Sequence, residues 1–184
     1  DVATFEFENI PVKTIKFLES KVPTHPNSKS LEISQDRLTE KNFISSIASI
    51  AKFCQVDNQS SLEFAIKKLG LPAVLKTRRF GYDGKGQLII NSREDIVNAL
   101  AQLPSQELVL ESLINIDREI SVIVARGTNG TMSSYPPVEN HHSNNILRLT
   151  NAPARLPAQE LLAVTKIAEN ICLKLDLIGL LAVE

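Results

Sequence analysis

The sequence has no tryptophan, a single methionine and only two cysteines among its 184 residues. Cys54 and Cys172 are far apart and each has apolar neighbours, so the pattern predicts no disulfide scaffold and favours a reducing compartment. The three histidines and two cysteines form no spaced ligand set, which gives little support to a redox or metal protein. These shortages leave an apolar core as the expected source of stability.

Excess charge of either sign is also missing, because 20 Lys and Arg residues oppose 21 Asp and Glu residues. Bulk binding of nucleic acid needs clustered excess Lys and Arg, so we expect no nucleic-acid partner, although a small basic cleft is compatible with this balance. No apolar run approaches the roughly 20 residues that span a bilayer, and nothing resembles a signal peptide. We therefore expect a cytoplasmic protein without a membrane partner.

The length suits one large domain or two small ones, and 43% of the residues are hydrophobic, enough for a substantial core. The chain begins with Asp1 in a strand-like run and stops at Glu184, directly after the apolar stretch 177–183. Natural domains rarely start and end inside strands. We therefore interpret the sequence as an excerpt of a longer chain.

Hydrophobic alternation predicts a strand at residues 4–8, with Phe5 and Phe7 on one face. Further along, Asp36 is expected to cap a helix that continues to about Ala51. These two segments predict that strands and helices are mixed from the start of the chain.

A second helix is predicted to end at Gly70, and Ser60 and Glu63 have the spacing of a capping box at its start. The other expected helices are 12–20, 96–103 and one from Pro157, and the other expected strands are 73–77, 88–90, 108–111, 118–126 and one ending at Glu184. Because strands and helices do not alternate strictly, the predicted fold class is α+β, or mixed α/β.

The loop at residues 81–86 is the strongest local signal. Its three glycines let backbone N–H groups approach an anion closely, and Lys85 adds a positive charge. It is not a Walker A loop, because Gly86 stands where Ser or Thr should follow the lysine, and it is not a dinucleotide-binding turn, since no helix follows it. A simple hairpin turn at Asp83-Gly84 and a cover for phosphates both fit, and one hairpin can be both.

Four other side chains have a structural and a functional interpretation. Lys76 ends an apolar strand and must reach solvent or an anion, so beside the loop it indicates a phosphate contact. Glu119 could accept hydrogen bonds from a ribose, although a solvated carboxylate is the simpler interpretation. His142, next to His141, lacks metal-ligand spacing. Glu184, after an apolar run, fits a magnesium ligand or an ordinary charge at the chain end.

Several strings occur in the order found in one enzyme family. They are Asp36-Arg37-Leu38-Thr39-Glu40-Lys41, Lys76, Gly81-Tyr82-Asp83-Gly84-Lys85-Gly86-Gln87, Arg118-Glu119-Ile120-Ser121, Tyr135-Pro136 with Glu139-Asn140-His141-His142, and Gly179-Leu180-Leu181-Ala182-Val183-Glu184. Together they resemble the 5-(carboxyamino)imidazole ribonucleotide synthase family, ATP-grasp enzymes of bacterial-type purine biosynthesis. The resemblance covers essentially the whole chain, and the YDGKGQ loop is its most specific part.

The resemblance implies an ATP-grasp fold, in which two α+β lobes clamp ATP, after the end of a Rossmann-like pre-ATP-grasp domain. It would place that remnant at 1–34 and the ATP-grasp domain at 35–184, with a small lobe at about 35–105 and a second lobe from about 106. The family's second metal carboxylate and further substrate-phosphate contacts would lie beyond Glu184. The excerpt would then be incomplete for catalysis, and the full-length protein would be a homodimer.

The reaction implied by the resemblance joins ATP, bicarbonate and 5-aminoimidazole ribonucleotide through carboxyphosphate, giving ADP, phosphate and the N5-carboxylated nucleotide. Magnesium, with manganese as an alternative, would accompany ATP. Two other functions stay open at this point. One is another ATP-grasp ligase acting on a carboxylate, such as a formate-using purine transformylase, and the other is a non-catalytic nucleotide-binding module.

The resemblance also implies roles for individual residues. ATP would be bound by Arg37, Lys76, Gly81, Gly84, Lys85, Gly86, Gln87, the hinge residues Glu111, Ser112, Leu113 and Ile114, and by Glu119 and His142. The aminoimidazole nucleotide would be faced by Glu6, Tyr82, Asp83 and Lys85, with Tyr82 and Asp83 as the catalytic pair. Asp83 would accept a proton from the amine, and Glu184 would be the first magnesium carboxylate.

Overall fold

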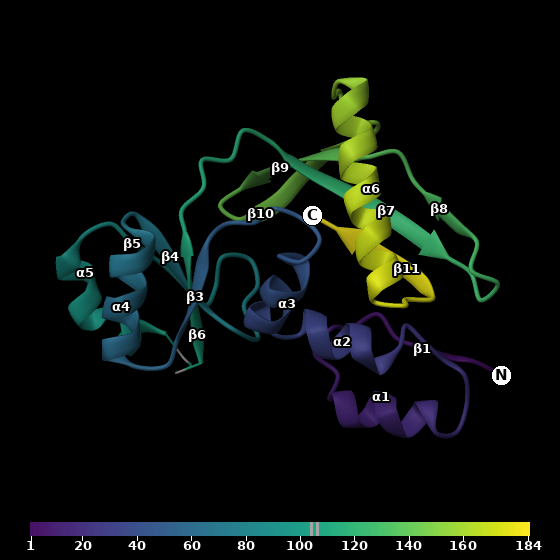
Figure 1. Cartoon of the computed structure of the whole chain (residues 1–184), viewed down its shortest axis with the longest axis horizontal. Coiled ribbons are helices and arrows are strands. Elements are labelled where there is room, and N and C mark those ends of the chain that lie inside the picture. The colour runs from purple at the N-terminus through teal and green to yellow at the C-terminus, as the bar shows by residue number, and fades with distance from the viewer. Residues whose placement is uncertain (104, 106) are drawn as a thin grey trace. The chain divides into compact units, whose positions relative to one another are not determined.

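The computed structural model describes residues 1–103, 105 and 107–184, and these residues form two compact units (Figure 1). The terminal unit consists of Asp1–Ser34 and Ile116–Glu184, and the middle unit is Gln35–Asn115. Both contain helices and strands, which confirms the predicted mixture of the two. No helix in the described part of the chain is both long and apolar enough to cross a membrane.

The middle unit is built on an antiparallel sheet with the strand order β3-β6-β4-β5. The strands are β3 (Phe53–Val56), β4 (Ala73–Thr77), β5 (Gln87–Ile90) and β6 (Leu108–Ser112). Two helices, α4 (Gln59–Leu69) and α5 (Arg93–Ala99), share one hydrophobic cluster with this sheet, and the short η1 (Leu100–Gln102) follows α5. The core residues are Val56, Leu62, Ala65, Ile66, Ala73, Leu75, Ile90, Ile96, Ala99, Leu108 and Leu110.

The sheet of the middle unit has a second face that carries charge. Because side chains alternate along a strand, Ala73, Leu75 and Thr77 point to one side of β4 while Val74 and Lys76 point to the other. On the charged side the helix α3 (Arg37–Ile44) contributes a lysine that reaches the central strand β6. The hydrophobic face thus stabilises the unit, and the opposite face is available for chemistry.

The helix α3 begins where the sequence predicts and ends earlier. Asp36 lies in extended backbone, and its carboxylate accepts the N–H groups of Leu38 and Thr39, each at 3.0 Å, as expected of an N-cap. The prediction that the helix continues to Ala51 is wrong, since it stops at Ile44. The next two residues are serines whose hydroxyls donate back to the carbonyls of Asn42 and Phe43, and such local bonds compete with continued helix.

The start of α4 also differs from the prediction. The capping box is formed by Asn58 and Ser61, whereas Ser60 and Glu63 lie within the helix. Asn58 adopts an extended backbone with φ −161°, which allows its side chain to accept the Ser61 N–H. The helix ends at Gly70 as predicted, with φ +83°.

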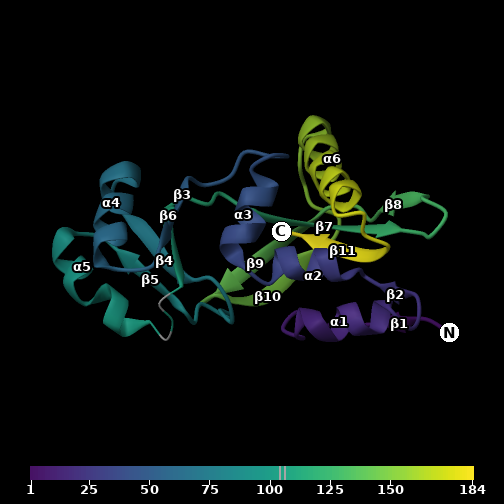
Figure 2. The ribbon, with the colours of Figure 1, turned by 60° about the horizontal axis from the view of Figure 1, so that its bottom comes forward.

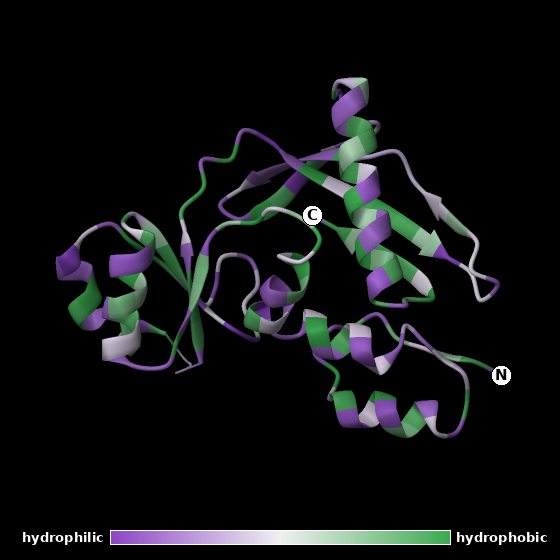
Figure 3. Cartoon of the chain, in the orientation of Figure 1, coloured by the Kyte–Doolittle hydropathy of each residue, from purple (hydrophilic) through white to green (hydrophobic). Residues whose placement is uncertain are grey.

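The terminal unit contains a sheet ordered β10-β9-β7-β11, with β8 paired to the far end of β7. Its strands are β7 (Glu119–Arg126), β8 (Met132–Ser134), β9 (Val138–Ser143), β10 (Ile146–Asn151) and β11 (Gly179–Val183). The long helix α6 (Ala158–Lys174) lies beside β7 and β11 (Figure 2). In Figure 3 this helix shows alternating hydrophobic and hydrophilic bands. The buried residues of the helix are Ala168, Ile171 and Cys172.

Residues 1–34 complete the terminal unit with two short helices, α1 (Val12–Glu19) and α2 (Ser28–Ser34), and a parallel pair, β1 (Ala3–Thr4) and β2 (Thr24–His25). Asn27 ties them to the end of α6, because its side-chain amide donates to the carbonyls of Leu175 at 3.3 Å and Asp176 at 2.9 Å. This segment is therefore packed with the C-terminal part of the chain.

Two predicted strands in the terminal unit differ from the prediction in length or in burial. The strand expected at 4–8 is limited to the two residues of β1, since its partner β2 is equally short, and Phe7 is 62% exposed. The apolar run before Glu184 does form β11, as predicted, but one face of this strand is exposed although such a run favours a buried strand. Leu180 is 64% exposed and Ala182 is exposed, because both point to one face of the strand, while Leu181 and Val183 point to the other, partly buried face.

Candidate functional site

The glycine loop joins two antiparallel neighbours, β4 and β5, so it is a hairpin connection. The Lys85 N–H donates to the Tyr82 carbonyl at 2.7 Å, and the two residues between them, Asp83 and Gly84, have φ values of +47° and +77°. This is the geometry of a type I′ turn, in which Asp and Gly are favoured. The turn holds Asp83 and Tyr82 exposed to solvent at the tip of the loop.

The base of the loop explains two of its glycines. The Thr77 N–H donates to the Gly86 carbonyl at 2.8 Å, which closes the hairpin beyond the last paired residues. A Cβ on Gly86 would lie 2.6 Å from Thr77 Oγ1, and a Cβ on Gly81 would lie 3.0 Å from Nη2 of Arg37. The Thr77 hydroxyl is buried and finds no hydrogen-bond partner among the described residues. Only glycine fits at both positions without displacing a neighbour.

At the tip of the loop, Lys85 folds back onto Tyr82. Its ammonium donates to the Tyr82 hydroxyl at 3.1 Å and lies 4.6 Å from the centre of the ring. The hydrogen bond with Tyr82 raises the pKa of Lys85, so the group stays positively charged. Both predicted substrate contacts are thus held together on the solvent side.

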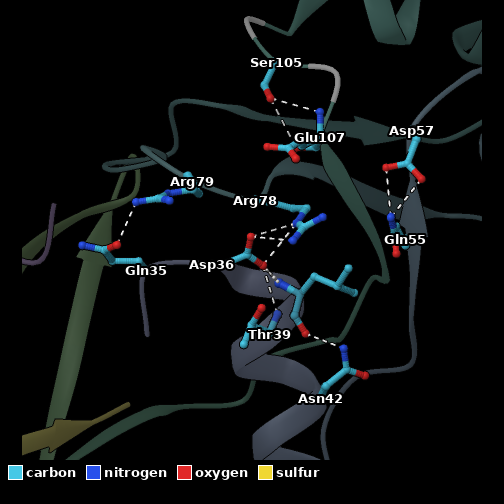
Figure 4. Close-up of polar contacts among 11 residues, drawn as sticks. Gln35, Asp36, Thr39, Asn42, Gln55, Asp57, Arg78, Arg79, Ser105 and Glu107 are labelled. Atoms are coloured by element: carbon cyan, nitrogen blue, oxygen red, sulfur yellow. Dashed lines mark hydrogen bonds and ion pairs between the residues drawn. The ribbon is translucent and has the colours of Figure 1, made fainter. Parts of the chain in front are cut away.

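The start of α3 is attached to the strand end that precedes the loop (Figure 4). Arg78 donates to Asp36 through Nε at 2.9 Å and Nη2 at 2.6 Å, and the Arg37 N–H donates to the Arg78 carbonyl at 2.9 Å. Burial raises the pKa of Asp36, but the hydrogen bonds from Arg78, Thr39 and Leu38 outweigh it, and the pKa is lowered overall. These contacts hold Arg37 in place, and its guanidinium donates to the Gly81 carbonyl at 3.3 Å.

On the charged face of the sheet, one carboxylate oxygen accepts from two lysines. Glu111 Oε2 lies 3.1 Å from the ammonium of Lys76 on β4 and 3.1 Å from that of Lys41 on α3. The Glu111 side chain is only 9% exposed, and Lys41 and Lys76 are 17% and 24% exposed. We call these three residues the lysine–glutamate cluster. Lys41 received no role from the sequence, although its spacing of four from Arg37 on one helix places both on the same face.

The predicted adenine hinge begins where β6 ends. The Ser112 N–H donates to the Lys52 carbonyl at 2.9 Å and the Leu113 N–H to the Pro72 carbonyl at 3.4 Å. Leu113 is 44% exposed and Ile114 is 55% exposed, although both are apolar. The segment leaves the sheet with apolar side chains facing solvent, which suits contact with a flat aromatic ligand.

In the terminal unit, pairing of β7 with β9 brings together two of the predicted nucleotide contacts. Glu119 is opposite Asn140, and His142 lies two residues further along β9 on the same side. The ring Nδ1 of His142 contacts the Glu119 carboxylate directly. Beside them, the Asn140 amide donates to the Ser121 hydroxyl at 2.5 Å. The sequence predicted both residues separately, and the strand register shows that they are neighbours.

Comparison with known families identifies the fold. A family model described as an ATP-grasp domain matches residues 42–184, and one described as a ribonucleotide synthetase preATP-grasp domain matches residues 1–35. The chain belongs to the ATP-grasp family.

Individual relatives show which branch of the ATP-grasp family the chain resembles. The chain is 38% identical over its whole length to the N5-carboxyaminoimidazole ribonucleotide synthase of Pseudomonas aeruginosa, of which it covers 51%. It is 41% identical to the bifunctional purine synthesis protein purC/E of Dictyostelium discoideum, covering 19% of that protein. A crystal structure of the Staphylococcus aureus N5-carboxyaminoimidazole synthetase with ADP superposes with a TM-score of 0.92 at 35% identity, over 99% of this chain and 48% of that one. The resemblance to this synthase family is confirmed, and the chain spans about half or less of the length of these relatives.

Two other predicted ATP-grasp site residues lie in the terminal unit, apart from the groups above. Glu6 lines a cavity of about 830 Å³ together with Glu8 and apolar residues of β11. Glu184 is exposed, and in the described part of the chain no three His, Cys, Asp or Glu side chains gather into a metal site. One carboxylate does not make a magnesium site by itself, so a metal held by Glu184 would need further ligands from outside the described residues.

Proposed function

We propose that this chain is part of an enzyme that carboxylates 5-aminoimidazole ribonucleotide with bicarbonate and ATP, in purine biosynthesis. The observation that carries the proposal is a set of cations in the middle unit. Arg37 donates to the Gly81 carbonyl of the glycine loop, and Lys41 and Lys76 share Glu111 on the charged face of the sheet. Identities of 38% and 40% to relatives named N5-carboxyaminoimidazole ribonucleotide synthase support the same substrates. Localisation in the cytoplasm, a homodimeric full-length protein, and magnesium or manganese as the metal are proposed with it.

The proposed chemistry has two steps. A bicarbonate oxygen attacks the γ-phosphorus of ATP, which breaks the bond to the bridging oxygen and gives ADP and carboxyphosphate. The exocyclic amine of the nucleotide then attacks the carboxyl carbon, or CO2 released from it in a closed site, and phosphate leaves with the electron pair of the broken C–O bond. The nitrogen loses one proton, which we assign to Asp83. The protein must neutralise the phosphates, exclude water and position the amine.

In this proposal the middle unit binds most of ATP. Arg37 and Lys76 contact the phosphates, the loop at 81–87 closes over them, and residues 111–114 hydrogen-bond adenine through their backbone. Side chains at the loop tip, Tyr82, Asp83 and Lys85, face the aminoimidazole nucleotide. Their exposure at a type I′ turn supports this role, because a residue that meets a second substrate must be accessible.

The terminal unit contributes the remaining proposed contacts. Glu119 accepts from the ribose hydroxyls, and His142, which touches it, lines the nucleotide site. Glu6 faces the aminoimidazole nucleotide, and Glu184 supplies one carboxylate to the metal. We also propose that residues 1–34 are the end of a pre-ATP-grasp domain and that 35–184 form the ATP-grasp domain.

The experiment that tests the function measures ADP release by the full-length protein. We expect release that requires both 5-aminoimidazole ribonucleotide and bicarbonate, with one carboxylated nucleotide formed per ADP. Release that depends on formate in place of bicarbonate would instead identify a purine transformylase. Saturable ATP binding without ADP release, whether bicarbonate or formate is supplied, would indicate a non-catalytic nucleotide-binding module.

A further inference from the structure

The lysine–glutamate cluster carries more positive than negative charge. Two ammonium groups meet one oxygen of Glu111, each at 3.1 Å, in a region where all three side chains are at least three-quarters buried. The two ammonium nitrogens are therefore at most about 6 Å apart, close enough to repel each other through a medium less polar than water. A second anion placed beside them would relieve this repulsion, so the cluster is arranged to accept one.

Each member of the cluster is fixed by its own element. Glu111 lies on the central strand β6, paired with Val74 of β4 and Phe53 of β3, so its carboxylate has little freedom. Lys76 is on β4, diagonal to Glu111 on the same face. Lys41 comes from α3, and its ammonium also lies 5.9 Å from the centre of the Phe53 ring. The position of Lys41 therefore follows from the fold and is not an accident of a flexible side chain.

The arrangement creates a competition for Lys76. If Glu111 were paired with Lys76 alone, the two would form a closed neutral pair, and a nucleotide phosphate would have to displace a buried carboxylate to reach the ammonium. Lys41 shares the same Glu111 oxygen and so neutralises part of its charge. Lys41 therefore weakens the ion pair between Glu111 and Lys76, and the carboxylate still has a partner when Lys76 binds a phosphate.

We propose that Lys41 is a positioning residue for ATP binding, which acts through Glu111 to keep Lys76 available for a nucleotide phosphate. This inference rests on the proposed function, because that function assigns Lys76 to the phosphates of ATP. The competing explanation is that Lys41 merely ties α3 to the sheet. The two explanations differ in what happens when Glu111 loses its charge.

The test compares MgATP binding, by titration calorimetry, in the full-length protein and in K41M, E111Q and the double variant K41M/E111Q. We expect K41M to weaken MgATP binding about tenfold, because Glu111 would then pair with Lys76 alone and a phosphate would have to compete with this partly buried carboxylate. The double variant should bind within about threefold of the unmodified protein, because the neutral amide no longer competes for Lys76. K68M, which removes an exposed lysine of α4, is the matched control and should bind normally.

Two results would overturn the inference. One is a double variant that binds as weakly as K41M or more weakly, since a tie between α3 and the sheet cannot be restored by removing its partner. The other, which does not depend on the folding of K41M, is weaker binding in E111Q. This change keeps the backbone groups proposed to bind adenine and removes only the charge that competes for Lys76, so the proposal expects tighter binding. Failure of the unmodified protein to bind MgATP would overturn both the inference and the proposed function. Normal binding with the expected rescue, but no carboxylation of aminoimidazole ribonucleotide, would overturn the proposed function alone.

Discussion

The base of the glycine loop leaves no room for a side chain at Gly86. In Gly86→Ala the new Cβ would lie 2.6 Å from Thr77 Oγ1 and 3.4 Å from Thr77 Cγ2, and the first distance is shorter than any ordinary contact. Thr77 cannot retreat, because it is buried in the core face of β4 and its own N–H is bound to the Gly86 carbonyl. The residue also has a φ of +72°, which alanine adopts at a cost of about 1–2 kcal/mol.

Adding overlap with a fixed neighbour, which costs about 1–3 kcal/mol in well-packed sites, we expect Gly86→Ala to lower the free energy of unfolding by about 2–5 kcal/mol. Chemical denaturation of the full-length protein measures this quantity. Gly130→Ala is the matched control, because Gly130 lies in the turn between β7 and β8, has a φ of +83°, and a Cβ there would meet nothing within 4 Å. It isolates backbone strain, so the control should cost only about 1–2 kcal/mol.

The difference between the two alanine variants is the contribution of the overlap with Thr77. If that is correct, adding Thr77→Ala to Gly86→Ala should cost less than the sum of the two single changes. Amide exchange of Thr77 should also accelerate in Gly86→Ala, since its bond to Gly86 is weakened. Equal losses of stability in Gly86→Ala and Gly130→Ala would refute the steric reasoning.

Two further predictions concern groups beside the loop. The pKa of Asp36 is lowered in the folded protein, so its contribution to stability is present above the pKa of the unfolded state and is lost as the pH falls through the folded pKa. Asp36→Asn keeps an N-cap but should cost about 1–3 kcal/mol at pH 7 and flatten the acid side of the stability profile, whereas Lys16→Met, at an exposed pair, should change stability by less than about 0.5 kcal/mol. Asp83→Asn should abolish carboxylation while MgATP affinity in calorimetry stays nearly unchanged, and unaltered turnover would contradict the proton-acceptor role.

Local sequence patterns correctly predicted structural features that depend only on residues close by in the chain, such as the start or end of a helix. Asp36 capped a helix and Gly70 ended one, because both effects involve hydrogen bonds or dihedral angles within a few residues. The end of α3 was predicted wrongly because apolar periodicity continues beyond Ser45, whereas the hydroxyl bonds from Ser45 and Ser46 back to the helix leave no trace in that periodicity. The cap of α4 is Asn58 and not Ser60, because the cap is the residue with extended φ and ψ angles, and the residue types alone do not fix those angles.

Contacts across the sheets could not be predicted in the same way. The lysine–glutamate cluster joins residues that are at least 35 positions apart in the sequence. Only the antiparallel register of β4 with β6 and the position of α3 bring the two lysines to the same Glu111 oxygen. The neighbourhood of Glu119 and His142 likewise depends on how β7 pairs with β9. A shift of one residue in that register would turn the two side chains to opposite faces.

The sheet of the terminal unit has a consequence for handling this chain on its own. Among the described strands β10 and β11 lie at its two edges, and every residue of β10 is exposed, including Ile146, Leu147 and Leu149. Edge strands with unpaired backbone groups and apolar side chains are templates for pairing with other extended segments. Preparations of these 184 residues alone should therefore be prone to aggregation through strand addition, and charged substitutions on β10 offer a direct way to suppress it.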